Sequence, residues 1–270
     1  DNKALQAGTS HNLGQNFARA FDLKFQSESG SIEYAWNTSW GVTTRMVGGL
    51  VMTHGDDNGL VTPPQLAPIE VVIVPIWKTD DERATLVEAA NKLKAELTSW
   101  TGRGEDRIRV HIDAREGMKP GAKYYEWELR GIPLRLELGP KDLEKQSVFS
   151  ARRDTRAKAA IPMAGVAGAV AQLLATIQSD LFAAAKARRE AATYRGDISY
   201  DRFKEIMDGP GGFVYAGWNG DPAVEARVKE ETKATIRVIP DAEFRSPVAP
   251  RVCMVTGEPA TCEVVWAKAY

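Results

Sequence analysis

Hydrophobic and polar positions along the middle of the chain change period several times. A continuous apolar run at residues 70–77 is typical of a buried strand. Beyond it, apolar residues recur at spacings of three and four, which predicts an amphipathic helix with Asp80 or Asp81 as its N-cap. The apolar stripe of this helix consists of Leu86, Ala90, Leu93, Leu97 and Trp100.

The same succession of patterns continues to about residue 165. It predicts further strands at 107–113, 133–138 and 148–153, and a short helix at 119–131. Strands that alternate with helices are typical of α/β domains. We therefore expect an α/β sandwich with a mainly parallel sheet in this part of the chain.

The N-terminal part has shorter patterns. Leu13, Phe17 and Phe21 lie four residues apart, as on one side of a helix. Residues 32–40 alternate as in a strand, so we expect Trp36 and Trp40 in the core.

An uncharged run at residues 46–52 follows, and we expect it to be buried because it has no charge to place in water. Arg45 stands at the edge of this run. On the pattern alone, Arg45 is either a surface residue at the start of a buried helix or a guanidinium that stacks on a ring or bonds a phosphate.

The C-terminal part begins with a long alanine-rich helix over 166–193. Helices at 200–207 and 225–233 and a strand at 235–240 follow, which predicts a small α+β domain. The glycine cluster at 209–212 lacks the lysine and serine of a phosphate-binding loop, so we interpret it as a turn.

The composition excludes some classes of function but does not identify one. The chain has 35 basic and 36 acidic residues, so any contact with nucleic acid must be local, and 151–158 is one local basic cluster that suits a phosphate or an ordinary solvated loop. Cys253 and Cys262 are too few for a secreted disulfide framework, and we expect a cytoplasmic protein. No uninterrupted apolar run reaches about 18 residues, so we expect no membrane partner.

Three strings carry a resemblance to a known family. Residues 40–45 (WGVTTR), 54–61 (HGDDNGLV) and 63–68 (PPQLAP) resemble motif 3 of prolyl-tRNA synthetases, class II aminoacyl-tRNA synthetases, in the archaeal- and eukaryotic-like branch. The resemblance implies four parts. These are the end of an antiparallel catalytic domain at 1–66, an anticodon-binding domain at 67–165, a connecting helix at 166–193 and a C-terminal domain at 194–270.

The resemblance also implies roles around Arg45. Arg45 would hold the adenine of ATP and Thr43 would also bind ATP, while Gln6 and Thr9 would contact ATP and the surroundings of its Mg²⁺. His11 would line the proline pocket and, with Arg45, belong to the catalytic residues. On the pattern alone, Thr9 caps a helix and His11 is a structural or surface histidine.

The string from Asp113 to Asp142 resembles the anticodon-binding domain of several class II synthetases. It implies that Glu128, Arg135 and Lys141 read the anticodon of tRNA(Pro), which carries two adjacent guanines. The pattern places them on a helix end, an exposed strand face and the following loop. Arginine and lysine donate to guanine O6 and N7, and a carboxylate accepts from the guanine amino group. The alternative is solvated surface charge with an intramolecular ion pair.

Relatives in this family often carry four cysteines as a structural zinc site in the C-terminal domain. The matching positions here are Ala216, Asp221, Cys253 and Thr256, and only Cys253 is a cysteine. A structural zinc site takes about four nitrogen or sulfur ligands, so we expect no zinc. The resemblance also implies that the terminal Tyr270 reaches back towards the active site.

The implied function is ATP-dependent activation of L-proline to prolyl-adenylate and transfer of the prolyl group to tRNA(Pro). Class II motifs 1 and 2 and the homodimer interface are expected N-terminal to Asp1, so we expect this chain to be inactive alone. Two alternatives stay open. One is a non-catalytic tRNA-binding paralogue, and the other is a class II synthetase for another amino acid, such as threonine, glycine or histidine.

Overall fold

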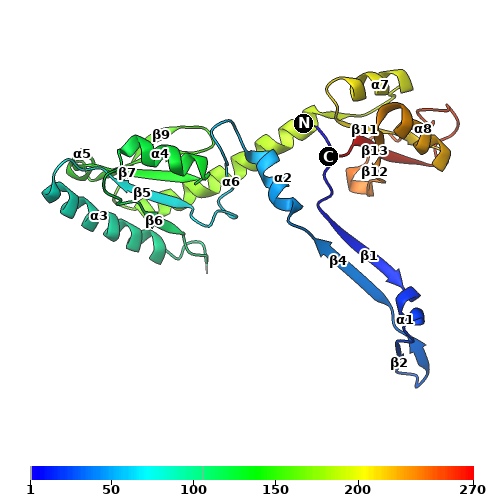
Figure 1. Cartoon of the computed structure of the whole chain (residues 1–270), viewed down its shortest axis with the longest axis horizontal. Helices are drawn as coiled ribbons and strands as arrows, with labels where there is room; N and C mark the ends of the chain where they lie inside the picture. The colour runs from blue at the N-terminus through cyan, green and yellow to red at the C-terminus, as the bar shows by residue number, and fades with distance from the viewer. Residues whose placement is uncertain (1, 105) are drawn as a thin grey trace. The chain divides into compact units, whose positions relative to one another are not determined.

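A computed structural model describes residues 2–104 and 106–270, and Asp1 and Glu105 lie outside the described part. The chain is a mixed α/β protein that forms two compact units (Figure 1). One unit is Leu50–Lys186, and the other joins Asp1–Gly49 to Ala187–Tyr270. The domain limits expected at residues 66, 165 and 193 stay predictions.

The Leu50–Lys186 unit is built on a five-stranded sheet in the order β6-β5-β7-β8-β9. Strands β6, β5 and β7 are parallel, whereas β8 and β9 are antiparallel to their neighbours, so the expectation of a mainly parallel sheet is wrong for those two. Only the short helix α5 (Pro140–Glu144) and its turns join β7 to β8, and parallel neighbours need a longer crossover. The strands are β5 (Val71–Pro75), β6 (Val110–Ile112), β7 (Leu134–Leu138), β8 (Ser147–Arg152) and β9 (Lys158–Pro162).

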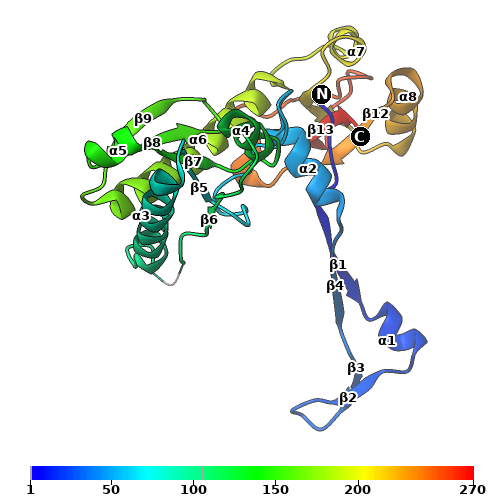
Figure 2. The same ribbon diagram turned by 60° about the vertical axis from the view of Figure 1, so that its left-hand side comes forward.

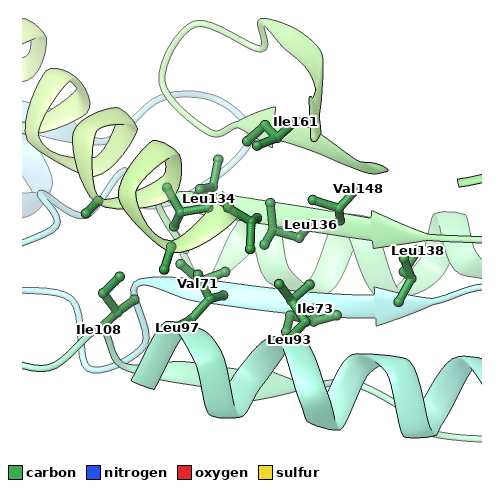
Figure 3. Packing of buried hydrophobic residues seen from close by; sticks show 14 of the residues in the cluster. Val71, Ile73, Leu93, Leu97, Ile108, Leu134, Leu136, Leu138, Val148 and Ile161 are labelled. Atoms are coloured by element: carbon green, nitrogen blue, oxygen red, sulfur yellow. The ribbon is translucent and has the colours of Figure 1, made fainter. Parts of the chain in front are cut away.

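Helices cover both faces of this sheet. Helices α3 (Asp80–Ser99) and α6 (Val166–Ala191) share a buried core with one face, to which Val71 and Ile73 contribute (Figure 3). Helix α4 (Pro120–Leu129) packs on the other face through Trp127. Because successive strand residues point to opposite faces, β5 supplies apolar side chains to both layers.

Helix α3 follows its predicted stripe. Its four leucine and alanine positions are buried, and Trp100 is partly buried against them. Its N-cap is Thr79, whose hydroxyl accepts a hydrogen bond from the Glu82 N–H (3.3 Å). Asp80 and Asp81 therefore lie in the first turn, where the helix dipole favours acidic side chains, and the predicted cap was wrong by one or two residues.

Helix α6 is long and apolar enough to cross a membrane, judged by length and composition alone. Its apolar 18-residue stretch has a mean hydropathy of 1.3, and 33% of that stretch is buried inside the protein. The protein interior explains part of that hydropathy, because one stripe of the helix lies in the core of the sheet. The buried stripe consists of Val166, Ala167, Val170, Ala171, Leu174 and Ile177.

Asp113, at the end of β6, attaches α4 to the sheet. Its buried carboxylate accepts hydrogen bonds from the Trp127 indole N–H (2.8 Å) and from two N–H groups of the Arg115 guanidinium (2.9 and 2.7 Å). Burial alone would raise the pKa of Asp113, but the bonds from Arg115 and Trp127 outweigh it and hold the pKa well below its usual range. The Lys123 ammonium donates to the Asp113 carbonyl (3.1 Å), so four side chains fix the helix.

The N-terminal segment forms narrow sheets. Strands β1 and β4 pair antiparallel, with α1, β2 and β3 beyond one end of this ribbon, and α2 follows β4 (Figure 2). The bounds are β1 (Gly8–Gly14), α1 (Asn16–Ala20), β2 (Lys24–Gln26), β3 (Ile32–Tyr34), β4 (Asn37–Val42) and α2 (Arg45–His54).

Burial in this segment differs from the expectation. Trp36 and Trp40 are 71% and 76% exposed, and no residue of α2 is buried, although 46–52 is uncharged. A two-stranded ribbon buries side chains only where another layer packs on it. The expected burial was therefore wrong. The strand expected at 32–40 is two strands of different sheets, β3 and β4, and of the helix stripe only Phe17 lies in α1, since Leu13 belongs to β1 and Phe21 follows the helix. The helix expected at the uncharged run is present as α2.

The C-terminal part forms a four-stranded sheet in the order β10-β11-β13-β12. Phe203 and Trp266 are fully buried at its centre, with ring centroids 6.1 Å apart. The elements are β10 (Thr193–Tyr194), α7 (Tyr200–Asp208), β11 (Phe213–Trp218), α8 (Pro222–Thr232), β12 (Ala234–Val238), η1 (Ala242–Phe244) and β13 (Cys262–Lys268).

Packing and backbone contacts occupy the positions aligned with zinc ligands. Ala216 is buried in the sheet core, and the Asp221 carboxylate caps α8 by accepting from the Ala223 N–H (2.8 Å). Burial acts to raise the pKa of the Cys253 thiol, but hydrogen bonds from Thr256 and neighbouring backbone groups lower it overall. Among residues 2–104 and 106–270, no group of three or more His, Cys, Asp or Glu side chains is placed to hold a metal ion.

Candidate functional site

Three of the residues expected around ATP meet at the start of α2. The Thr43 hydroxyl accepts a hydrogen bond from the Arg45 N–H (3.3 Å), which supplies an acceptor to a free backbone donor at the helix start. The Arg45 guanidinium donates to the Gln6 side-chain oxygen (3.1 Å), although 39 residues separate the two. All three side chains lie at the surface, and Arg45 keeps further N–H groups available for a ligand.

Thr9 and His11 lie on the adjacent ribbon. Thr9 pairs with Gly41 and His11 with Ser39, and residues two apart on a strand share a face, so the two side chains lie on the same side. A Cβ atom at Gly41 would come within 3.3 Å of the Thr9 hydroxyl, so the glycine leaves that hydroxyl room. The nucleotide and proline roles of these residues stay predictions.

The end of the chain lies beside this site. The Tyr270 N–H donates to the Ala4 carbonyl (3.0 Å), and the Ala4 N–H donates to the Lys268 carbonyl (2.9 Å). Ala4 is two residues from Gln6, so the C-terminal tyrosine comes next to the segment that contacts Arg45. This arrangement agrees with the expectation that Tyr270 reaches back towards this region.

Glu128 and Arg135 come together in the Leu50–Lys186 unit, on the face of its sheet that α4 covers. The Arg135 guanidinium donates to the Glu128 carboxylate (2.9 Å) and to the Glu137 carboxylate (3.1 Å). The expectation that Arg135 lies on an exposed strand face is wrong, because α4 covers that face and Arg135 is only 7% exposed. The ion pair of the alternative interpretation is present, with the Arg135 guanidinium buried and the Glu128 carboxylate half-exposed.

Arg135 is held on three sides. Its guanidinium stacks over the Tyr124 ring, 3.9 Å from the centroid, and burial together with the neighbouring Glu137 raises the pKa of that tyrosine. Three of its five N–H groups point to the two carboxylates, which leaves two for a ligand. The sequence analysis missed Tyr124 and Glu137, although the strand period places Glu137 on the same face as Arg135.

Lys141 is not bonded to this pair in the described part of the chain. It is an exposed residue in the first turn of α5, which begins after β7 ends. No hydrogen bond or ion pair joins its side chain to Glu128 or Arg135 in the described part of the chain. The structure therefore brings together two of the three residues expected to read the anticodon.

A second ion pair fixes the helix end that carries Glu128. The Arg153 guanidinium donates to both oxygens of Asp56 (2.8 and 2.6 Å) and to the Glu128 carbonyl (2.9 Å), and Arg153 is only 5% exposed. These bonds hold the pKa of Asp56 down at about 2. The sequence analysis missed this contact, because 97 residues separate its two partners.

Backbone contacts reinforce the same junction. The Leu60 N–H donates to the Leu129 carbonyl (3.1 Å), and the Thr62 N–H donates to the Gly131 carbonyl (3.1 Å). Gly59 has a positive φ, and a Cβ there would lie 2.6 Å from the Leu129 oxygen. The glycine is therefore required for this close approach.

Asp56→Asn tests the ion pair to Arg153. The substitution leaves a buried guanidinium without a carboxylate, so we expect the Leu50–Lys186 unit to lose about 1–3 kcal/mol of stability at neutral pH. The partial exposure of Asp56 screens its charge, which keeps the loss in this range. Hydrogen exchange of the β5 and β7 amides measures it.

The stability difference between wild type and Asp56→Asn should depend on pH. Asp56 has a lowered pKa in the folded chain, so its contribution is complete above the unfolded pKa of about 3.9 and disappears as the pH falls towards 2. The difference between wild type and variant should shrink across that window. Asp57→Asn is the control, because Asp57 forms no ion pair with a described residue. Equal effects of the two variants would contradict the assignment.

Comparisons with known proteins find relatives for this chain. Residues 70–173 match the family model described as "Anticodon binding domain", and residues 200–270 match "Prolyl-tRNA synthetase, C-terminal". The chain is 49% identical over 274 residues to a protein named proline--tRNA ligase from Chloroflexus aggregans, covering 100% of this chain and 54% of that protein. It is 50% identical over 270 residues to the protein of that name from Cytophaga hutchinsonii, covering 100% of this chain and 53% of that protein.

The chain thus spans about half the length of the curated relatives it matches. Its anticodon-binding and C-terminal matches agree with the alignment along the whole of this chain, which is similar throughout to about half of a prolyl-tRNA synthetase.

Proposed function

We propose that this chain forms part of a proline--tRNA ligase, in which it reads the anticodon of tRNA(Pro) and contributes one side of the ATP site. The observation that carries the proposal is the buried Arg135 held beside the half-exposed Glu128 within the anticodon-binding domain. The relatives' printed name supports the choice of proline.

The geometry suits a guanine base. Glu128 is 43% exposed and offers carboxylate oxygens to the guanine amino group, and Arg135 keeps two N–H groups for acceptors such as O6 and N7. Anticodon bases are unpaired, so a protein can reach their edges. Because Arg135 is already held by Tyr124 and two carboxylates, binding orders few further side-chain rotamers.

At the other site, we propose that Arg45 holds the ATP adenine, with Gln6, Thr43 and Thr9 around it and His11 facing proline. ATP and proline would react to prolyl-adenylate and pyrophosphate, and the prolyl group would pass to the terminal ribose of tRNA(Pro). These residues bind and orient the reactants, and the reaction needs no covalent nucleophile from the protein.

Magnesium in such reactions is bound largely by nucleotide phosphates and water. The described residues contain no cluster of three or more acidic, histidine or cysteine side chains placed for a metal ion, so we assign no residue of this chain to Mg²⁺. The homodimer and the cytoplasmic location are part of the proposal, and the two free cysteines are compatible with that location.

A non-catalytic tRNA-binding paralogue is the second candidate. The contact between Arg45 and Gln6 and the pairing of Arg45 with Thr43 speak against it, because a protein that only binds tRNA does not use them. A synthetase for another amino acid is disfavoured by the match of residues 200–270 to the prolyl-tRNA synthetase C-terminal model.

Glu128→Gln tests the anticodon site. The wild-type chain should bind tRNA(Pro) at least about 30-fold more tightly than a transcript whose two anticodon guanines are adenines, since each base contact contributes about 1–3 kcal/mol and two are lost. The variant should lose most of this discrimination, measured by fluorescence anisotropy. The control is Glu96→Gln, which removes the same charge on α3 at the opposite face of the sheet. Unchanged discrimination in Glu128→Gln would contradict the assignment.

A second test concerns the reaction itself. We propose that this chain contains only part of the site that activates proline, since it spans about half the length of its relatives. The 270-residue chain alone should therefore show no proline-dependent exchange between ATP and pyrophosphate. Exchange above the level of an Arg45→Ala chain would contradict this proposal.

A further inference from the structure

A basic segment, Arg152–Lys158, forms the end of β8 and the turn into β9, next to the anticodon site. Two of its four cations are already neutralised. Arg152 pairs with Asp154 and Asp180 (2.6 Å each), and Arg153 pairs with Asp56. These two arginines are therefore structural.

The other two cations of the segment, Arg156 and Lys158, are exposed, and neither forms an ion pair with a described carboxylate. Arg156 has a positive φ of 61°, a conformation that non-glycine residues adopt rarely, so its backbone is held in one specific turn. The segment thus presents two available charges from a fixed hairpin.

Arg156 and Lys158 line one cavity together with Glu128 and Arg135. The cavity has a volume of about 190 Å³, and its apolar wall includes Trp127 and Ile132. It therefore combines an apolar surface on which a flat base can lie, polar groups for the base edge and two cations without ion-pair partners.

Charge explains why the site needs these cations. The carboxylates of Asp56, Glu128 and Glu137 outnumber the guanidinium groups of Arg135 and Arg153 by one. A polyanionic RNA would meet a net negative site if only these five groups were present. Arg152 also lines the cavity and pairs with both Asp154 and Asp180. With these groups counted, Arg156 and Lys158 bring the cluster from a net negative charge to neutrality, five cations to five carboxylates.

We propose that Arg156 and Lys158 bind backbone phosphates of the nucleotides whose bases Glu128 and Arg135 read. The inference rests on the proposed function and adds two contact residues to it. Phosphate contacts fix the register of a nucleic acid without specifying its sequence, whereas base contacts specify it. In this cavity, Arg156 and Lys158 therefore orient the RNA, and Glu128 and Arg135 select the base.

The test uses the 270-residue chain with Arg156→Asn and Lys158→Gln combined. Asparagine tolerates a positive φ, so the turn is kept. Binding of tRNA(Pro) is measured by anisotropy over a salt series. Each lost phosphate contact lowers the slope of log K against log salt by about 0.7 for single-stranded RNA, so the double variant should lose about 1.4 in slope and about tenfold in affinity near physiological salt.

Selectivity separates this role from a structural one. The ratio of affinities for tRNA(Pro) and the adenine-substituted transcript should be unchanged in the double variant, and the thermal unfolding midpoint should match wild type. Lys92→Gln, on α3 at the opposite face, is the control for loss of one exposed lysine and should keep the wild-type slope. It is compared with Lys158→Gln alone.

Three outcomes decide the matter. A wild-type slope in the double variant, with selective binding by the wild-type chain, would overturn the phosphate contacts and leave the proposed function standing. A loss of selectivity together with the slope would also overturn the division of roles. Failure of the wild-type chain to prefer tRNA(Pro) would instead overturn the proposed function, and the inference with it.

Discussion

The ion pair between Arg153 and Asp56 organises the proposed anticodon site. A buried guanidinium must keep a carboxylate partner, because an unpaired charge in the interior is strongly unfavourable. Arg153 meets this requirement with Asp56, and its Nε–H donates to the Glu128 carbonyl, at the end of α4. The loop after α2 and the helix that carries Glu128 are therefore fixed together.

The two proposed sites are also close together in the sequence. Arg45 begins α2 and His54 ends it, and Asp56 follows two residues later. The same short stretch thus supplies the proposed nucleotide contact at one end and the anchor of the anticodon site at the other. The sequence string that resembles motif 3 covers both, although the roles implied for it concern only ATP.

The burial of Arg135 affects how the proposed anticodon site would recognise a base. An exposed arginine must be ordered when RNA binds, whereas this one is already held by a stacked ring and two carboxylates. A buried ion pair is by itself weak evidence of stability, since apolar side chains of similar volume often stabilise as well. The arrangement suits the proposed role, in which a few fixed donors and acceptors are presented to a base.

Local periodicity accounts for what the sequence predicted. The stripe of α3 and the alternation in β7 depend only on neighbouring residues, and both were found as expected. The direction of β8, the exposure of Trp40 and the burial of Arg135 depend on which layer covers which face. The contact between Asp56 and Arg153 spans 97 residues, and no local pattern encodes it. Of the site residues, Arg45 and Gln6 were named together only through the family resemblance.

The most direct test of the central claim is chemical probing of tRNA(Pro) bound to the 270-residue chain, with a reagent that attacks guanine at N1 and N2. A site in which the Glu128 carboxylate accepts from the guanine amino group must shield those atoms. At least one of the two anticodon guanines should become unreactive on binding, while unpaired guanines elsewhere in the tRNA keep their reactivity. Anticodon guanines that react equally in free and bound tRNA(Pro) would contradict the account.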